Sequence, residues 1–271
     1  MSLFCDRVLA ERIERAEADL MARAIVRYSE GFATAIRGGV ATYAERGSPF
    51  NKVAGVGFGG VPSAAELDAV EAAFAGRDAP VQIELATLAD PAVGALLTAR
   101  GYRLEGFENV LGLALGDGLD RMIPDGVDVR VSGEDEFDAW LEVVADGVAH
   151  PDSEGVPSHE EFPREIVEEA ERDFAAAGVV RYSALLDGVL AGGGSLRIAD
   201  GVAQLAGAAT APAHRRRGVQ TALLSARLAD AAAAGCDIAV VTTQPGSKSQ
   251  QNVQRRGFDL LYARAVLVKR T

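Results

Sequence analysis

Apolar runs separated by short polar turns dominate the second half of the chain. Three of them follow one another as VVRYSALL, VLAGGGSLRI and VAQLAGAAT, which together cover most of residues 179–210. Asp187-Gly188 and Asp200-Gly201 stand at the breaks, and an Asp-Gly pair between two apolar runs is typical of a tight β-hairpin. The pattern therefore predicts three antiparallel strands.

Helical patterns surround these strands. Apolar residues recur at helical spacing in EDEFDAWLEVVADGVAH (residues 134–150), with acidic residues in the first turn after Ser132 or Gly133. Another helix is predicted after Ser158, a candidate N-cap three residues before Glu161. The remaining predicted elements are a strand at 127–131, an alanine-rich helix from about Val219, a strand at 238–243, a helix at 247–256 and a terminal hairpin of strands.

The two halves of the chain repeat an order of elements. Placing Arg100-Gly101 on Arg256-Gly257 gives an offset of 156 residues (256 − 100), and an aromatic residue follows in both copies. At this offset the apolar run VQIELAT (81–87) meets DIAVVTT (237–243). Each half then has a strand, a short helix, Arg-Gly-aromatic and a hairpin of strands, which suggests a tandem duplication.

A stretch rich in Gly, Asp and Pro, LGDGLDRMIPDG (residues 115–126), separates the two halves. Such punctuation is usual at a domain junction. We therefore predict two domains, at residues 1–120 and 121–271. The mixture of helices and hairpins predicts the α/β class, with a mixed, mostly antiparallel sheet flanked by helices in each domain.

Composition narrows the class of protein. The 271 residues are 48% hydrophobic and carry a formal net charge of −12, so we expect no affinity for nucleic acid, and a cationic partner is favoured. No apolar stretch reaches the ~18 residues of a membrane span and no signal peptide opens the chain, so we expect a cytoplasmic protein without membrane contact. Of the two cysteines, Cys236 precedes a strand and is interpreted as a core residue, and no metal site is predicted.

The loop APAHRRRG (residues 211–218) joins a predicted strand to a helix and holds three consecutive arginines. Arginines are unfavourable at a helix N-terminus, so we expect a negative group nearby. Exposed backbone N–H groups, the missing Cβ of Gly218 and charge-assisted donors together suit a diphosphate. The alternative is a solvated loop in which Gly218 only eases a turn. The loop matches neither the P-loop nor the dinucleotide-binding motif G-x-G-x-x-G.

The stretch LAGAATAPAHRRRGVQTALL (residues 205–224) resembles the acetyl-CoA loop of the GCN5-related N-acetyltransferases, with their R/Q-x-x-G-x-G/A motif at residues 215–220. QQNVQRRGF (residues 250–258) is similar to the later helix and Gly-Phe signature of that family, and the order of elements over about 127–271 agrees as well. The resemblance implies two tandem acyl-CoA N-acyltransferase-like domains, with acetyl-CoA bound by the second.

The resemblance also implies residues that would contact acetyl-CoA. In the family, loop N–H groups bind the pyrophosphate, and the preceding strand splays from its neighbour to admit the pantetheine arm. Ala208, Ala209 and Thr210 would line that arm, and Ser249 and Asn252 on the later helix would face the cofactor. The phosphates would be held by Arg215, Arg216, Arg217, Gly218, Val219, Gln220 and Thr221.

The sequence departs from the family at the positions that carry chemistry. Gln220 replaces the small residue at the end of the motif, a change that leaves the backbone N–H groups accessible. Val253 stands where many members have a Tyr that protonates the departing thiolate. The strand before the loop lacks the Glu often used as general base, and Gln204 is its nearest polar residue. Proximity and orientation, with a base acting through water, are then expected to carry the rate.

Three residues are candidates for proton transfer. His150 and Glu154 lie in AHPDSEG, on the loop that forms the acceptor wall in the family. Tyr262, in the last predicted hairpin, is a candidate proton donor. Each also has a simpler interpretation: solvated loop residues in the first two cases, and packing on a strand in the third.

The first half lacks an arginine loop. GFGGVPSAAEL (residues 57–67) stands in its place, and Ser63 precedes Glu66 by three residues, a capping box that uses helix N–H groups. We predict a degenerate copy that binds no CoA and instead shapes the acceptor pocket. Asn51 and Glu108 are candidates to reach toward that pocket, with structural roles as the alternative.

The sequence thus predicts an N-acetyltransferase that moves an acetyl group directly from acetyl-CoA to the amine of a small-molecule acceptor, with a cationic acceptor favoured. The alternative is a catalytically silent acyl-CoA-binding or regulatory module. Val253 and the missing strand Glu keep that alternative open.

Overall fold

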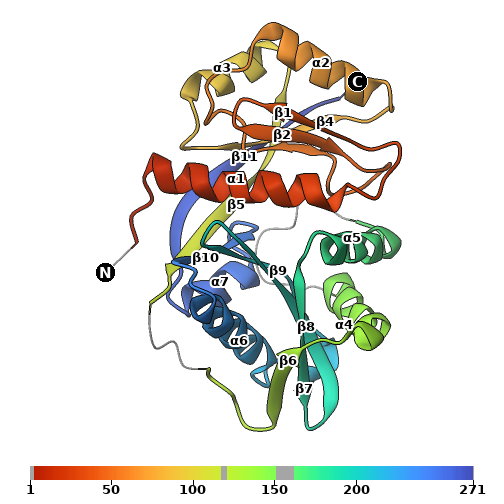
Figure 1. Cartoon of the computed structure of the whole chain (residues 1–271), viewed down its shortest axis with the longest axis vertical. Coiled ribbons are helices and arrows are strands. Elements are labelled where there is room, and N and C mark those ends of the chain that lie inside the picture. The colour runs from red at the N-terminus through yellow and green to blue at the C-terminus, as the bar shows by residue number, and fades with distance from the viewer. Residues whose placement is uncertain (1–2, 117–120, 151–161, 271) are drawn as a thin grey trace. The chain divides into compact units, whose positions relative to one another are not determined.

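The computed structural model describes residues 3–116, 121–150 and 162–270, which form two compact units (Figure 1). Of the described residues, 3–111, 162 and 242–270 belong to the first unit, and 112–116, 121–150 and 163–241 belong to the second. The predicted domains at 1–120 and 121–271 follow the repeat in the sequence, and the boundaries of the compact units differ from them. The two domains stay a prediction.

The first unit is a mixed sheet in the strand order β1-β2-β3-β4-β11-β5. Only β3 and β4 pair in parallel among the pairs described, and the others are antiparallel. Its strands are β1 (Phe32–Ile36), β2 (Gly39–Tyr43), β3 (Lys52–Ala54), β4 (Val81–Ala86), β5 (Arg103–Ala114) and β11 (Asp259–Lys269). Its helices are α1 (Arg7–Ala24), α2 (Ala64–Ala75), α3 (Pro91–Ala99) and α7 (Lys248–Gln254). Helix α1 was not among the predicted elements, although Asp6 caps it by accepting a hydrogen bond from the Leu9 N–H.

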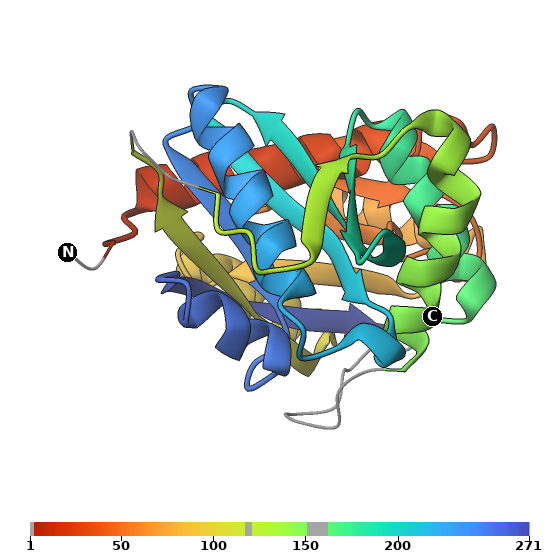
Figure 2. The same ribbon diagram turned by 90° about the horizontal axis from the view of Figure 1, so that it is seen from below.

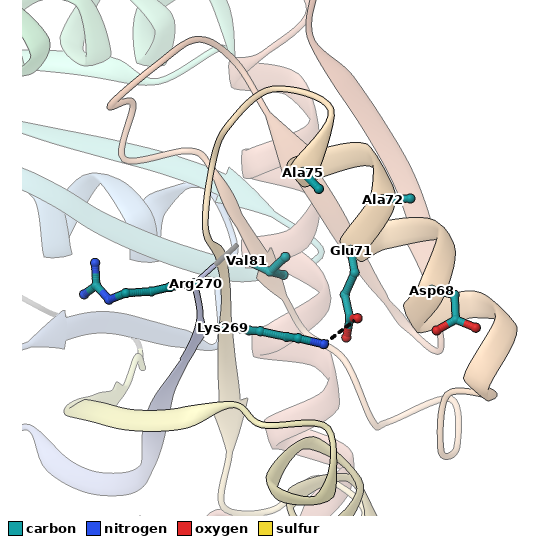
Figure 3. A pocket seen from close by; sticks show the side chains of 7 residues that line it. All are labelled: Asp68, Glu71, Ala72, Ala75, Val81, Lys269 and Arg270. Carbon is teal, nitrogen blue, oxygen red and sulfur yellow. Dashed lines mark hydrogen bonds and ion pairs between the residues drawn. The ribbon is translucent and has the colours of Figure 1, made fainter.

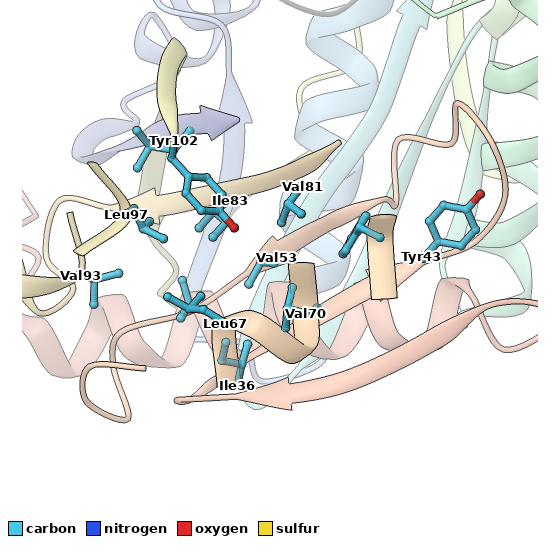
Figure 4. Packing of buried hydrophobic residues seen from close by; sticks show 14 of the residues in the cluster. Ile36, Tyr43, Val53, Leu67, Val70, Val81, Ile83, Val93, Leu97 and Tyr102 are labelled. Atoms are coloured by element: carbon cyan, nitrogen blue, oxygen red, sulfur yellow. The ribbon is translucent and has the colours of Figure 1, made fainter. Parts of the chain in front are cut away.

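Alternating apolar residues of these strands form the core of the first unit. Val53 and Ile83 from neighbouring strands pack with Leu67 and Val70 of α2 (Figure 4). Burying one side chain of this size contributes about 1.5–3 kcal/mol. The packing therefore holds α2 against the sheet and fixes where its N-terminus lies.

The second unit is a sheet in the order β10-β9-β8-β7-β6, in which β9 and β10 pair in parallel and the other pairs are antiparallel. Both predicted Asp-Gly turns are confirmed, because Asp187 and Gly188 have φ of 52° and 80°, and Asp200 and Gly201 have φ of 50° and 74°. Positive φ at both central residues is the type I′ hairpin geometry. The strands are β6 (Val127–Val131), β7 (Val180–Leu186), β8 (Val189–Ala199), β9 (Val202–Thr210) and β10 (Ile238–Thr243). The helices are η1 (Glu134–Glu136), α4 (Phe137–Ala149), α5 (Arg164–Ala176), η2 (Pro212–His214) and α6 (Val219–Ala233).

Consecutive glycines in β8 let helices approach both faces of this sheet. A Cβ at Gly193 would lie 2.4 Å from Nε1 of Trp140 on α4, whereas a Cβ at Gly194 would lie 3.0 Å from Cζ of Arg227 on α6. Because successive strand residues point to opposite faces, α4 and α6 cover opposite faces. Figure 2 shows them, in green and blue, on either side of the strands.

The Arg-Gly-aromatic repeat marks the same helix ending in both halves. Gly101 and Gly257 have φ of 86° and 91°, and the N–H groups of Tyr102 and Phe258 donate to carbonyls five residues back. This is a Schellman ending. One continuous strand follows in each copy, β5 or β11. The predicted terminal hairpins are therefore wrong, because no turn interrupts either strand.

The two halves share their order of elements. The series α1, β1, β2, β3, α2, β4, α3, β5 returns as α5, β7, β8, β9, α6, β10, α7, β11. The last strand of the second copy, β11, pairs with β4 of the first over Val81–Ala86. Just after β5, the Leu115 N–H donates to the Asp237 carbonyl that precedes β10, at 2.8 Å. The last strand of the second copy thus pairs with the first copy, which explains why β11 belongs to the first unit.

Candidate functional site

The corner where β9 runs into α6 leaves the start of that helix without a capping side chain. Gly218 is the N-cap residue, with φ of 85°, and makes no side-chain cap. The short helix η2 and the three arginines bridge from β9 to this point. The first N–H groups of a helix have no partner within it, so this end favours an anion.

The corresponding helix of the first half is capped by its own residues. The Oγ of Ser63 accepts from the Glu66 N–H at 3.3 Å, and Glu66 Oε2 accepts from the Ser63 N–H at 2.7 Å, which confirms the predicted capping box. Hydrogen bonds from Ser63 and the guanidinium of Arg37 lower the pKa of Glu66 to about 2. A carboxylate therefore already sits at the N-terminus of α2, where a diphosphate would have to compete with it.

Arg215 is used inside the second unit. Its guanidinium donates to the carbonyls of Gly147 (3.2 Å) and His150 at the C-terminal end of α4, and to that of Thr210 (3.4 Å). The C-terminus of a helix carries partial negative charge, so the end of α4 is one of the negative groups expected near the arginines. Arg215 thereby joins α4 to the end of β9.

The other two arginines of the loop differ in what they contact. Nη2 of Arg217 lies 2.9 Å from Oδ2 of Asp187 in an exposed ion pair. Arg216 is exposed, adopts φ of 63°, and has no side-chain partner among the residues that the structure describes. Arg216 is therefore the loop guanidinium available to a ligand.

Gly218 is required by the protein's own packing. A Cβ at this position would lie 2.7 Å from Cγ and 2.8 Å from Cβ of Pro124, in the segment before β6. We expected the missing Cβ to leave room for a ligand, and that reason is wrong because Pro124 occupies the space. The glycine is still needed for its positive φ and for this close contact.

Strand β9 contains a bulge just before the loop. Gly207 and Ala208 together oppose Gly194 alone, since the regular pairing with β8 shifts at this point. Gly207 has φ of 53°, a left-handed conformation that side chains rarely adopt. Bulges of this kind occur next to active sites and redirect the chain.

On its other edge, β9 stops pairing with β10 a few residues before the bulge. Pairing with β10 runs from Val202 to Gln204, although β9 continues to Thr210. Regular pairing of β9 with β10 thus ends at Gln204, which agrees with the splay that the family resemblance implies. Ala208 is exposed here, whereas Ala209 packs into the core with Trp140. The Oγ1 of Thr210 is buried without a partner among the described residues.

Arg227 supports the bulge from the α6 side. It is 2% exposed, and Nη1 donates to the carbonyls of Ser195 (3.0 Å) and Ala206 (3.3 Å), while Nε donates to that of Leu223 (3.1 Å). Burial lowers the pKa of Arg227 to about 10. Ser195 and Ala206 flank the bulge, so Arg227 holds β8 and β9 together where their regular pairing is lost.

The candidates for proton transfer lie in different parts of the chain. His150 ends α4, is exposed, and places Nδ1 3.1 Å from Oδ1 of Asp146. Glu154 lies outside the described residues. Tyr262 belongs to the first unit, where its buried hydroxyl donates to Oε1 of Glu14 at 2.7 Å. Burial and the Glu14 carboxylate raise the pKa of the Tyr262 hydroxyl well above its ordinary value.

Tyr262 is part of a buried group of charges in the first unit. Arg264, 2% exposed, donates Nε to Glu14 Oε1 at 2.7 Å and lies 3.7 Å from Glu84 and 3.5 Å from Glu108. Burial and the nearby Glu84 carboxylate raise the pKa of Glu108 to about 7. Arg264 is thus a structural partner of Glu108, in agreement with the structural alternative for this residue.

Three further predicted residues, Asn51, Ser249 and Asn252, lie in the first unit. Asn51 accepts from the Ala44 N–H at 2.9 Å and donates to the Glu45 carbonyl at 2.6 Å, so it shapes a loop. Ser249 is exposed and Asn252 half-buried on α7, while Val253 is buried beside them in the sequence. Ser249 and Asn252 stay predicted cofactor contacts.

A cavity of about 370 Å³ lies beside α2 in the first unit (Figure 3). Glu71 and Lys269 line it, and Lys269 Nζ donates to Glu71 Oε2 at 2.7 Å. Arg100 donates to the same carboxylate at 2.9 Å. Because these charges neutralise one another and the cavity lies along the side of α2, it offers no helix N-terminus to a diphosphate.

Sequence reasoning missed a buried carboxylate, Glu171 on α5. It is 6% exposed, and its Oε2 has no hydrogen-bond partner within the described part of the chain. Burial raises the pKa of Glu171 to about 8, against the opposing effect of Arg181. Its position is visible in the sequence, since it shares a helix face with Val167 and Phe174, four residues before and three after.

The donors at the β9–α6 corner fit a CoA-type ligand. Uncapped helix N–H groups and Arg216 suit a diphosphate, and the part of β9 beyond its pairing with β10 suits an amide-containing arm. Within the described residues, no group of His, Cys, Asp and Glu side chains is arranged to hold a metal ion. None of the described helices is long and apolar enough to cross a bilayer.

Comparisons with known proteins agree with this geometry. Residues 148–258 match the model of the acetyltransferase (GNAT) family. A GCN5-related N-acetyltransferase from Kribbella flavida shares the fold with 21% identity and a TM-score of 0.67, with 96% of each chain covered. A tandem GNAT protein from the clavulanic acid biosynthesis pathway is 14% identical with a TM-score of 0.61, and 97% of this chain and 96% of that chain are covered. No curated protein matches the sequence significantly. The predicted α/β fold, with a mostly antiparallel sheet flanked by helices, is confirmed.

Proposed function

We propose that this chain, whose residues 148–258 form a GNAT acetyltransferase domain, transfers the acetyl group of acetyl-CoA to the amine of a small-molecule acceptor. The cofactor would bind at the β9–α6 corner of the second copy. One observation carries the proposal: an uncapped helix N-terminus, with an Arg216 that has no side-chain partner among the described residues, follows a strand whose pairing with β10 has already ended.

The residues of the corner would divide the work of binding. Arg216 and the N–H groups at the start of α6 hold the diphosphate, and backbone groups of Ala208 to Thr210 orient the pantetheine arm. Ala209 contributes backbone only, since its side chain packs against α4. The thioester then lies near the bulge of β9, and holding it beside an amine supplies much of the acceleration.

The first copy would bind no CoA. Its helix α2 is capped by Ser63 and Glu66, and a charged carboxylate occupies the place of the phosphates. One acetyl-CoA per chain is therefore expected in a calorimetric titration. A cationic acceptor is favoured by the net charge of −12.

A silent acyl-CoA-binding module is the second candidate. Val253 is buried at the position where the family often has a Tyr, so this helix supplies no acid for the thiolate. Purified protein with acetyl-CoA and a panel of amines separates the two functions, with free thiol followed over time. Amine-dependent thiol release supports the transferase, binding without turnover supports the silent module, and a failure to bind acetyl-CoA refutes both.

A further inference from the structure

We propose that Glu171 is the general base of this site, and that it takes a proton from the ammonium group of the acceptor beside the bulge of β9. The inference rests on the proposed function, because it assigns a role in the same acetyl transfer. Glu171 lies on α5, whereas the Glu that often serves as general base in the family lies on the strand before the loop.

The carboxylate lies directly against the bulge. A Cβ on Gly207 would lie 2.8 Å from Glu171 Oε1, so any other residue at this position would push the carboxylate away. Gly207 is the first of the two bulged residues, and the next, Ala208, is exposed. Glu171 thus lies beside the bulge of β9, where the pantetheine arm is expected to end.

A purely structural role does not account for this side chain. Two other buried carboxylates have cationic partners at short distance: Glu14 has Arg264 at 2.7 Å and Glu84 has Lys52 at 2.5 Å. Glu171 Oε2 has no hydrogen-bond partner in the described parts of the chain. Burying a carboxyl group without such partners is unfavourable, and groups held in this way are typical of functional sites.

The surrounding charges leave Glu171 poised near neutral pH. Burial raises its pKa to about 8, and Arg181 on β7 opposes that rise. Arg181 is itself paired with Glu134 at 2.8 Å. A base with a pKa near the working pH is well suited to accept a proton and release it again. The other charged side chains on these elements are Asp138, Glu142 and Asp146 on α4, Arg197 on β8, and Arg164, Glu165, Glu168, Glu169, Arg172 and Asp173 on α5 itself.

Glu171 takes one proton from the acceptor's ammonium group, which frees the nitrogen lone pair. That pair forms the new N–C bond to the thioester carbonyl carbon, and the C–S bond breaks with its electron pair on sulfur. The second nitrogen proton passes to the thiolate, so the products are an amide and CoA thiol. Glu171 returns its proton to solvent.

Glu171→Gln keeps the shape of the side chain and removes the base, and Glu165→Gln is the matched control, an exposed residue on the same helix. We expect Glu171→Gln to lower kcat about 100-fold, at the low end of general-base effects, with an unchanged Kd for acetyl-CoA by calorimetry. The wild-type kcat should rise with pH through an inflection near 8, and the variant should lose it. The Glu165→Gln protein should match the wild type in kcat, in the Kd for acetyl-CoA and in the pH dependence of kcat.

The outcomes separate this inference from the proposed function. A kcat for Glu171→Gln within threefold of wild type, or a change in the Kd of acetyl-CoA alone, overturns the role of Glu171 and leaves the transferase standing. Carbon NMR of the labelled Glu carboxyls gives a second measurement on the wild type, and an ordinary pKa for Glu171 would also overturn it. If no amine is turned over by the wild type, the proposed function and this inference fail together.

Discussion

Removing the guanidinium of Arg216 tests where the diphosphate binds. The three loop arginines provide an internal comparison, because Arg215 donates to carbonyls at the end of α4 and Arg217 pairs with Asp187. Arg216 is exposed, without such a partner among the described residues. Arg216→Ala should therefore weaken acetyl-CoA binding without changing the melting temperature.

The size of the effect follows from the environment of the side chain. A hydrogen bond to a charged group contributes about 1.5–3 kcal/mol, and the lower end applies to Arg216 because it is exposed and screened by salt. About 1.4 kcal/mol corresponds to a tenfold change in Kd. We expect a roughly tenfold higher Kd for acetyl-CoA at low salt, and a smaller difference at high salt.

Calorimetric titration of the wild type, Arg216→Ala and Arg217→Ala gives the answer, with thermal unfolding of each protein alongside. Arg217→Ala should bind acetyl-CoA within about threefold of the wild type, since an exposed ion pair contributes little. The reasoning is refuted if Arg216→Ala binds as tightly as the wild type while Arg217→Ala binds more weakly. It is also refuted if loss of Arg216 lowers the melting temperature.

Three further predictions concern stability. Gly218→Ala should cost about 1–2 kcal/mol for its left-handed backbone alone, plus the contact with Pro124, measured as a lower urea midpoint; an unchanged midpoint would show that the helix start is mobile. Arg264→Met leaves the buried Glu14 carboxylate without its cation, and should cost about 3–5 kcal/mol near neutral pH; the loss should shrink toward acid pH as the stranded carboxylates bind protons, and a loss independent of pH would contradict the electrostatic cause. Folding raises the pKa of Glu171 from 4.5 to about 8. Between these pH values the folded state keeps a proton that the unfolded state has released. The contribution of Glu171 to the free energy of unfolding therefore falls as pH rises through that window. Glu171→Gln should therefore be more stable than the wild type at pH 8 and nearly equal to it at pH 4.5 in urea unfolding, and an advantage that does not grow with pH would argue against burial as the cause.

Local signals predicted much of the fold. Asp-Gly pairs marked both hairpins of the second half, and Ser63 with Glu66 marked the start of α2, because turns and caps depend on residues a few positions apart. The terminal hairpins were wrong, since apolar alternation alone does not tell one long strand from two short ones. Helix α1 was missed, although Asp6 caps it. The pairing of β11 with β4 joins residues far apart in the sequence, so no local pattern shows it.

The site was predictable only where a contiguous motif carries it. The arginine loop and Gly218 stand together in the sequence, so their place between β9 and α6 could be predicted. The role of Gly218 could not, because Pro124 lies far from it in the chain. Glu171 was hidden for the same reason, since its charge matters only beside Gly207 of another element.

The glycine run at 192–194 has a consequence for engineering this protein. Beside the bulge of β9, β8 has no side chains at these positions, and Trp140 of α4 and Arg227 of α6 pack against its two faces. Substitutions meant to change which amine is used therefore belong at exposed residues of the helices and not in this strand. The glycines themselves are the positions to leave untouched, since a methyl group at Gly193 would displace the indole of Trp140.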